Sequence, residues 1–459
     1  MTLTRRMFGG LLLAAPFART QDKARPESFK VYTDGPRLLL NRNRIRLLQR
    51  ERERRSLRWD QFETLWAGNA EFPEPGFACA LHYQITNQPA SAKKAIAWAA
   101  GAAATDIRQI ALVADWCSTV LTGVEQERIF AKLKKAASGQ VPKTLPEARD
   151  KVFAAVALTD SEPDLTAAVL TTVFEKYWLA SLLPSLREAK FHISNDMANP
   201  LLEIFHAYRD NLNFDLRDNY PAFFKNYPLV HLMSHYPAPF PASQNEFRIP
   251  AEPNILHKEP DFQKAVLSRA AELAMVAFDT NSAETQVLQG WLMNDRYLMR
   301  GTAGMPYELL WANPYQPGLS YYHIPLALHD RIGGQLFVRS SWEDNAAWVG
   351  YFEGNLQLFQ DGGITMLDPQ LSREPLDIEE ATVFFAKAGR KFQVPKRAAE
   401  DKTDDVFVVG LEPRQHYHVE ADEQEMFEEE ADAGGILFLP NLRTGTGVRL
   451  NPVALDSTA

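Results

Sequence analysis

The sequence predicts a chain that forms helices first and strands afterwards. From about residue 36 to residue 311, apolar residues recur at three- and four-residue spacing between short polar breaks, which is the period of amphipathic helices. After residue 328 the period becomes two, and Asp361-Gly362 is typical of a hairpin turn. The composition, 46% hydrophobic and 23% charged, is that of a globular protein. We therefore expect a multidomain α-then-β protein: an incomplete (α/α) helical toroid over residues 19–325, then an antiparallel β-sandwich over residues 326–459.

Residues 1–18 predict an export signal. They combine a basic start, a short apolar stretch and a small-residue end, which is the pattern of a secretory signal peptide. Arg5 and Arg6, followed by Met7 and Phe8, resemble the twin-arginine signal of bacteria. The roughly 10 apolar residues are too few for a hydrocarbon core that needs about 20. We expect a periplasmic or secreted protein with no membrane span after cleavage.

Turn residues separate the helices expected in the first part of the chain, and two irregular stretches interrupt their succession. Gly123 and Pro163 stand at breaks between helices. The Pro-rich stretch 237–260 and the aromatic stretch 305–325 are expected to be long loops at the rim of a cleft, or loops packed by their own aromatics. The helices expected on periodicity are 92–104, 107–121, 125–137, 145–158, 165–186 and 262–278.

Short runs in which apolar and polar residues alternate predict strands in the second half of the chain. Their spacing is that of an antiparallel sandwich. The strands expected are 335–340, 346–352, 355–360, 364–367, 405–411, 415–420, 435–439 and 447–450.

Charge and cysteine usage exclude several classes of protein. The formal net charge of −9 gives no overall attraction for nucleic acid, and no nucleic-acid-binding motif is present. Residues 400–432 hold 13 acidic side chains against Lys402 and Arg414, so an anionic glycan in the helical half is not excluded. Eight arginines at 42–58, interleaved with acids, predict a solvated helix face. Cys79 and Cys117 are too few for a disulfide scaffold; they are expected to be buried, with one disulfide as the alternative after export.

Three patches of sequence resemble the heparinase II/III group of polysaccharide lyases. Pro36-Arg-Leu-Leu-Leu40 is similar to the phrase that leads into the first helix of that group. Phe337-Val-Arg-Ser-Ser-Trp342 resembles an early strand of its sandwich, and residues 355–369 resemble the strand-turn-strand that follows. The group usually carries a His-x-His-x-Asp segment just before that strand, where this chain has Phe352-Glu-Gly354. The resemblance implies a lyase that cleaves an acidic polysaccharide by β-elimination.

A lyase of this kind must remove a proton beside a uronate carboxylate. It needs a group that neutralises the carboxylate, a base, and an acid for the leaving oxygen. His231 and His235 are four residues apart, so they share a face of a helix and could be catalytic groups, metal ligands or structural histidines. The candidate catalytic residues are Tyr227, His231, His235 and Tyr236.

Asn195, Arg209 and Arg248 are the candidate substrate-binding residues. Arg209 could hold a carboxylate through its planar guanidinium, and Arg248 could reach over a cleft from the Pro-rich loop. We expect no cofactor and no metal site, and a polysaccharide or oligosaccharide as the partner. Two alternatives remain: a non-catalytic glycan-binding protein on the same fold, and a glycoside hydrolase with Glu203 and Glu246 as its carboxylate pair.

Overall fold

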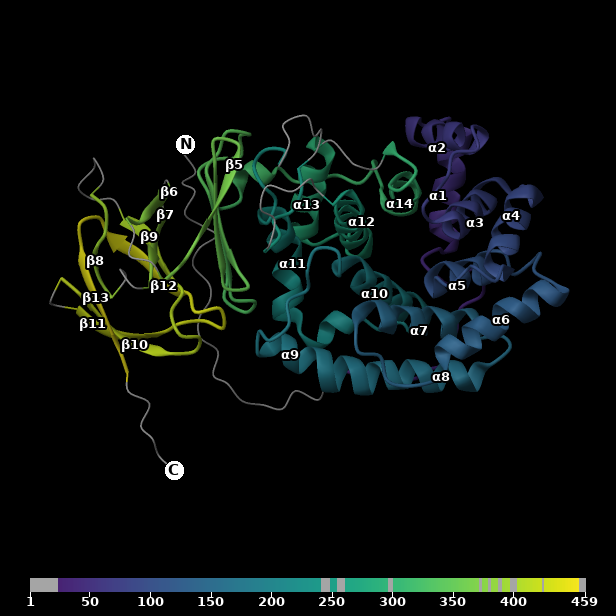
Figure 1. The fold of residues 1–459 in the computed structure, drawn as a ribbon, viewed down its shortest axis with the longest axis horizontal. Helices are drawn as coiled ribbons and strands as arrows, with labels where there is room; N and C mark the ends of the chain where they lie inside the picture. The colour runs from purple at the N-terminus through teal and green to yellow at the C-terminus, as the bar shows by residue number, and fades with distance from the viewer. Residues whose placement is uncertain are drawn as a thin grey trace, which may run out of the picture.

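The chain folds into a helical part followed by a β part, as the sequence predicts (Figure 1). The computed structural model describes residues 24–240, 248–253, 261–295, 300–370, 374–378, 381–386, 390–396, 403–422 and 425–453. The predicted signal at 1–18 lies outside the described residues. Within them, no helix is long and apolar enough to cross a membrane.

Capping side chains and prolines set where the helices begin. Asn41 accepts a hydrogen bond from the backbone N–H of Arg44, and Asp261 accepts two from the first turn of its helix. Seven of the described helices (α3, α4, α7, α8, α9, α11 and α14) have proline in the first turn, and those that follow a loop need no intrahelical N–H there. The α-helices are α1 Arg42–Glu53, α2 Leu57–Ala67, α3 Pro75–Thr86, α4 Pro89–Ala100, α5 Ile107–Trp116, α6 Gly123–Ala137, α7 Leu145–Ala157, α8 Pro163–Thr172, α9 Leu183–Arg187, α10 Ala198–Leu212, α11 Pro221–Met233, α12 Phe262–Phe278, α13 Ala283–Asn294 and α14 Met305–Trp311.

Two helical segments differ from the expectation. The helix expected at 165–186 is built from α8, a π-helical segment η1 (Val173–Leu182) and α9. The stretch 305–325, expected to be a loop, begins with α14, because Leu309, Leu310 and Trp311 pack into the helical core.

The strands of the described residues form three sheets. The first is ordered β1-β2-β3-β4-β5, the second β12-β9-β7-β6 and the third β11-β10-β13-β8. All pairings are antiparallel except β7 with β9, which is parallel. The acid-rich β11 lies at the edge of its sheet, where charge hinders pairing with another chain. The strands are β1 Ala327–Asp330, β2 Gln335–Arg339, β3 Trp348–Phe352, β4 Asn355–Gln360, β5 Gly363–Leu367, β6 Leu376–Ile378, β7 Ala381–Phe385, β8 Lys391–Gln393, β9 Thr403–Val409, β10 His416–Ala421, β11 Glu425–Glu430, β12 Leu437–Arg443 and β13 Gly447–Pro452.

The first sheet is covered on both faces, which fixes the junction between the two parts. Phe337 and Trp348 point to the helical side and pack with Met233 and Tyr236. Leu336 and Val338, whose side chains point to the opposite face, pack against the second sheet. Because side chains alternate across a strand, one short sheet joins the two cores.

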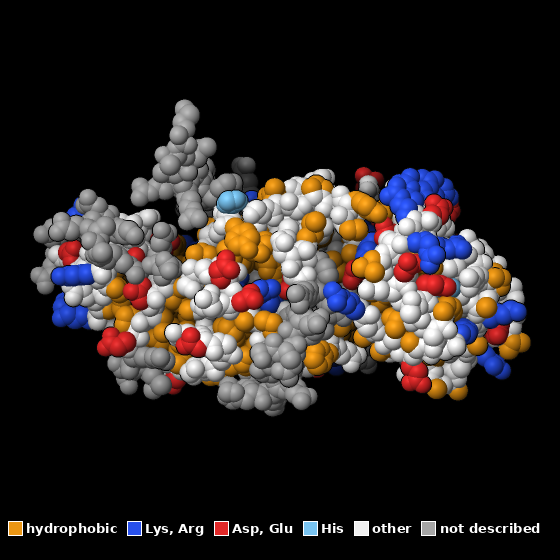
Figure 2. Space-filling view, turned by 90° about the horizontal axis from the view of Figure 1, so that it is seen from above, with side chains coloured by type: hydrophobic (Ala, Val, Ile, Leu, Met, Phe, Trp, Pro, Cys, Tyr) orange, Lys and Arg blue, Asp and Glu red, His pale blue; other side chains and the backbone are white. Residues whose placement is uncertain are grey.

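The described residues agree with two expectations, one about the cysteines and one about the arginine run 42–58. Cys79 and Cys117 are buried free thiols, and burial raises their pKa to about 11 and about 12. Figure 2 shows lysine and arginine gathered at the end of the molecule formed by α1 and α2. Most arginines of the 42–58 run are exposed, and Arg58 pairs with Glu51 at 3.1 Å.

Candidate functional site

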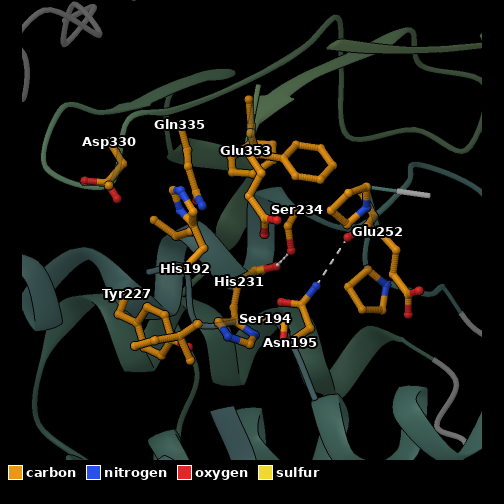
Figure 3. A pocket seen from close by; sticks show the side chains of 18 of the residues that line it. His192, Ser194, Asn195, Tyr227, His231, Ser234, Glu252, Asp330, Gln335 and Glu353 are labelled. Atoms are coloured by element: carbon orange, nitrogen blue, oxygen red, sulfur yellow. Dashed lines mark hydrogen bonds between the residues drawn. The ribbon is translucent and has the colours of Figure 1, made fainter. Parts of the chain in front are cut away.

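A cavity of about 250 Å³ lies where the helical part meets the first sheet. Its walls come from the α9–α10 loop, from α11, from residues 250–253 and from the β1–β2 and β3–β4 turns. A concave pocket on which a few polar groups converge is the usual form of a small-molecule site. Figure 3 labels ten of its lining residues: His192, Ser194, Asn195, Tyr227, His231, Ser234, Glu252, Asp330, Gln335 and Glu353.

α11 supplies one wall of this cavity. Tyr227 and His231 lie one helical turn apart, and their rings meet edge to face with centroids 4.9 Å apart. The far end of the helix is tied to the first sheet, because the indole Nε1 of Trp348 donates to the carbonyl of Met233 at 2.9 Å. The sheet therefore fixes the helix that presents both side chains.

His231 is the most unusual side chain of the cavity wall. Its exposed fraction is 1%, and neither ring nitrogen has a hydrogen-bond partner among the described residues. Its Nδ1 lies 3.8 Å from Oε1 of Glu272, a fully buried carboxylate of α12. A histidine at a cavity with a carboxylate behind it has the arrangement of a general base with an orienting acid.

A buried ionic cluster holds Glu272 in place. Its Oε1 lies 3.3 Å from Nε2 of His235, and its Oε2 lies 3.4 Å from Nη1 of Arg269. Burial disfavours the charge of Glu272, but His235, Arg269 and His231 together outweigh burial and lower the pKa of this carboxyl below its usual value. Burial also lowers the pKa of His235 to about 4. At neutral pH the cluster therefore holds a carboxylate, a guanidinium and a neutral imidazole.

Asn195 and Tyr227 complete the polar groups around His231. The amide of Asn195 donates to the carbonyl of Ala251 at 3.5 Å, a weak bond that leaves its other donor available. Burial raises the pKa of Tyr227 well above its usual range. Its hydroxyl is protonated at neutral pH and has no hydrogen-bond partner in the described part of the chain.

Three of the seven residues nominated from sequence line the cavity: Asn195, Tyr227 and His231. His235 follows the end of α11, and its ring packs against Trp291 at 4.6 Å on the side away from the cavity. Tyr236 lies in the core between helices and sheet, where its hydroxyl donates to Gln357 at 2.9 Å. The shared face of the two histidines points at Glu272 rather than at open space.

Both nominated arginines are engaged elsewhere. Arg209 donates to the carbonyl of Phe278 at 2.7 Å, and its guanidinium lies over the Phe278 ring. Arg248 bonds to Asp295 at 2.9 Å and also pairs with Asp344. Neither arginine lines the cavity, so neither is placed to hold a substrate carboxylate there, contrary to expectation.

The carboxylate pair of the hydrolase alternative is likewise not assembled in the described structure. Glu203 is fully buried and bonds to Arg108 at 2.6 Å, with Arg149 at 3.5 Å. Glu246 lies outside the described residues. Among the described residues, no cluster of histidine, cysteine and acidic side chains is suited to hold a metal ion.

Sequence reasoning missed two residues of the site. Glu272 stands alone in the apolar run Ala270-Ala-Glu-Leu-Ala-Met275, and a lone acid on an apolar helix face is a signal that could have found it. Glu353 lines the cavity from the β3–β4 turn. No protein-family model and no curated protein matches the chain. The residues of the cavity therefore carry the functional argument.

Proposed function

We propose that the protein is a heparinase II/III-like polysaccharide lyase that cleaves a uronate-containing polysaccharide by β-elimination in this cavity. The observation that carries the proposal is His231. It is buried at the cavity wall, its ring nitrogens have no hydrogen-bond partner among the described residues, and Glu272 lies 3.8 Å behind Nδ1. A buried imidazole at a cavity wall with a carboxylate behind it is a candidate general base.

Each step of the elimination has a group in the cavity. His231 takes the proton from the carbon beside the uronate carboxylate, and Glu272 stabilises the resulting imidazolium. The bond between the neighbouring carbon and the glycosidic oxygen breaks, and the electron pair leaves with the oxygen. Tyr227 donates the proton that this oxygen needs. Asn195 donates to the uronate carboxylate, which makes the abstracted proton more acidic.

The arrangement of helices and sheets supports the fold expected of such a lyase. α3, α5, α7, α10 and α12 touch one another in succession. α4 and α6 pack outside them, in a second row. Two rows of this kind fit an incomplete (α/α) toroid, and the stacked sheets fit a β-sandwich with one added layer. The Phe352-Glu-Gly354 turn borders the same cavity as His231, which supports a site at the position that the group uses.

The proposal is tested by the absorbance of the unsaturated product. The mature protein is incubated with a panel of uronate polysaccharides, and ultraviolet absorbance is followed. We expect a rise with at least one polysaccharide. His231→Gln and Tyr227→Phe should each slow the reaction by about 100-fold or more, because each removes a proton-transfer group.

His418→Gln is the matched control, because His418 is exposed on β10 and does not line the cavity. It should keep full activity. Unchanged activity in His231→Gln would remove histidine from the mechanism, and reducing ends released without absorbance would indicate a hydrolase instead.

Non-catalytic glycan binding is the second candidate, and one observation favours it. The turn at Phe352-Glu-Gly354 lacks the histidines that the heparinase II/III group carries there. Retention on a glycan affinity gel without any absorbance change would support this candidate over the lyase.

We also propose that the protein is exported, on the basis of the twin-arginine-like signal. Periplasmic fractionation of cells that produce the full chain tests this, with Arg5→Lys and Arg6→Lys together as the variant. The variant should stay in the cytoplasm. Equal export of both forms would exclude the twin-arginine route.

A further inference from the structure

Three arginines are buried in the described part of the chain, and Arg339 differs from the other two. Arg108 bonds to Glu203 at 2.6 Å, and Arg269 contacts Glu272 at 3.4 Å. Arg339 is 3% exposed, its Nε has no hydrogen-bond partner, and no carboxylate of a described residue lies within ion-pair distance of its guanidinium. Buried charges are nearly always paired in folded proteins. Arg339 therefore lacks a counter-charge that the described residues do not supply.

Arg339 lies where the first sheet meets the helical part. It ends β2 two residues after Phe337, so the two side chains share the face that points to the helices. Its Cζ lies 4.2 Å from the ring centroid of Trp342, a side chain that packs against both the helical core and the junction cluster. The indole Nε1 of Trp342 is also buried and has no hydrogen-bond partner among the described residues. The two stacked side chains thus offer N–H donors that have no acceptor.

The charged groups nearest to Arg339 do not balance it. Burial and repulsion by Arg248 lower the pKa of Arg339 to about 9, so it still carries its charge at neutral pH. Arg248 is itself engaged by Asp295 and Asp344. Tyr321 is the other titratable group close to Arg339, and burial raises the pKa of its hydroxyl, which is therefore uncharged at neutral pH. An anion at this point would offset both the burial of the guanidinium and the repulsion between the two arginines.

We propose that Arg339 and Trp342 hold a tetrahedral oxyanion, inorganic phosphate or sulfate, at the junction of the helical part and the first sheet. A guanidinium presents two parallel N–H groups to two oxygens of one oxyanion, and an indole N–H can donate to a third. A carboxylate has only two oxygens, and the guanidinium would use both. Neither Arg339 nor Trp342 lines the cavity that contains His231, so this site is separate from the proposed lyase site.

Equilibrium dialysis of the mature full chain against radiolabelled phosphate, and separately against radiolabelled sulfate, tests the proposal. The experiment is done at about pH 7, where Arg339 is charged, with sodium chloride to hold the ionic strength constant. We expect saturable uptake of about one anion per chain, which acetate displaces poorly. Uptake of one of the two anions alone would identify the ligand. Saturable uptake of neither anion overturns the proposal.

Variants locate the uptake. Arg339→Met removes the charge but keeps an unbranched apolar side chain, and it should weaken uptake at least about tenfold. Trp342→Phe keeps an aromatic ring without the N–H donor and should weaken uptake by about threefold to fivefold. Arg449→Gln is the matched control, because Arg449 lies on β13 with a side chain that is 47% exposed. It should bind the anion as the wild type does. Uptake that survives Arg339→Met overturns the proposal, because it would come from the surface elsewhere.

Thermal unfolding separates an anion site from a purely structural arginine. In chloride buffer without phosphate or sulfate, Arg339→Met should not lower the melting temperature, because it removes an unpaired buried charge. Addition of the bound anion should raise the melting temperature of the wild type by about 2 °C and leave that of Arg339→Met unchanged. If the variant instead melts lower than the wild type by the same amount in both buffers, the role of Arg339 is structural and the proposal is overturned.

Discussion

At the scale of single residues, one buried carboxylate organises the site. Glu272 touches His231 at 3.8 Å and His235 at 3.3 Å, and Arg269 balances its charge. The two histidines share this acid but differ in role. His231 borders the cavity, whereas His235 is packed against Trp291 behind it. The tertiary structure thus separates two histidines at helical spacing: His231 lies at the cavity wall, and His235 lies behind it against Trp291.

His235 makes stability depend on pH in a defined window. Burial lowers its pKa from 6.5 to about 4, although Glu272 opposes the shift; Arg269 adds to it, and Asp295 opposes it. Between these values the unfolded chain binds a proton that the folded chain does not bind, so the free energy of unfolding falls as pH drops from 6.5 towards 4. The full effect is about 3 kcal/mol. Urea denaturation at several pH values measures it.

His235→Gln isolates this contribution. The variant lacks the titrating group, so its free energy of unfolding should fall less steeply than that of the wild type across the same window. Identical slopes for the two proteins would contradict the assignment to His235.

At the scale of elements, the position of α11 depends on the first sheet. Trp348 of β3 lies against Tyr236, with ring centroids 5.3 Å apart, and its indole bonds to the last turn of α11. Gly350 makes room for this ring, because a Cβ at that position would overlap the indole of Trp348. One strand therefore places the helix that carries Tyr227 and His231.

Gly350→Ala should destabilise the protein and disturb the cavity. The added methyl group forces Trp348 out of its position, and overpacking of this kind costs about 1–3 kcal/mol. Urea denaturation followed by tryptophan fluorescence measures the loss. Gly363→Ala on β5 is the control, since a Cβ there meets only one atom at an ordinary contact distance of 3.8 Å. Its effect should stay within about 0.5 kcal/mol, and equal losses in both variants would refute the steric argument.

At the scale of the whole molecule, Arg248 joins the helical part to the β part. Its guanidinium bonds to Asp295 at the end of α13 and to Asp344 in the β2–β3 loop. Asp295 in turn pairs with Arg269, which contacts Glu272. A chain of ion pairs therefore runs from the domain junction to the acid behind His231.

Arg248→Gln should lower the free energy of unfolding by about 1–3 kcal/mol, because it leaves the nearly buried Asp295 with one cation fewer. Arg331→Gln is the matched control: it breaks a 3.2 Å pair with Glu429 at a side chain that is 52% exposed. That change should cost less than about 1 kcal/mol. Equal costs in chemical denaturation would show that the Arg248 contacts contribute no more than a surface pair.

The sequence by itself determined the order of helices before strands and most strand positions. Period and turn residues are local, so they can be read along the chain. Three nominated residues, Asn195, Tyr227 and His231, line the cavity. Tertiary structure decided the rest. Arg209 and Arg248 bind partners that are distant in sequence. Glu272 lies beside His231 because α12 packs behind α11. Contacts of this kind cannot be predicted from residue spacing, because the partners can be separated by any number of residues along the chain.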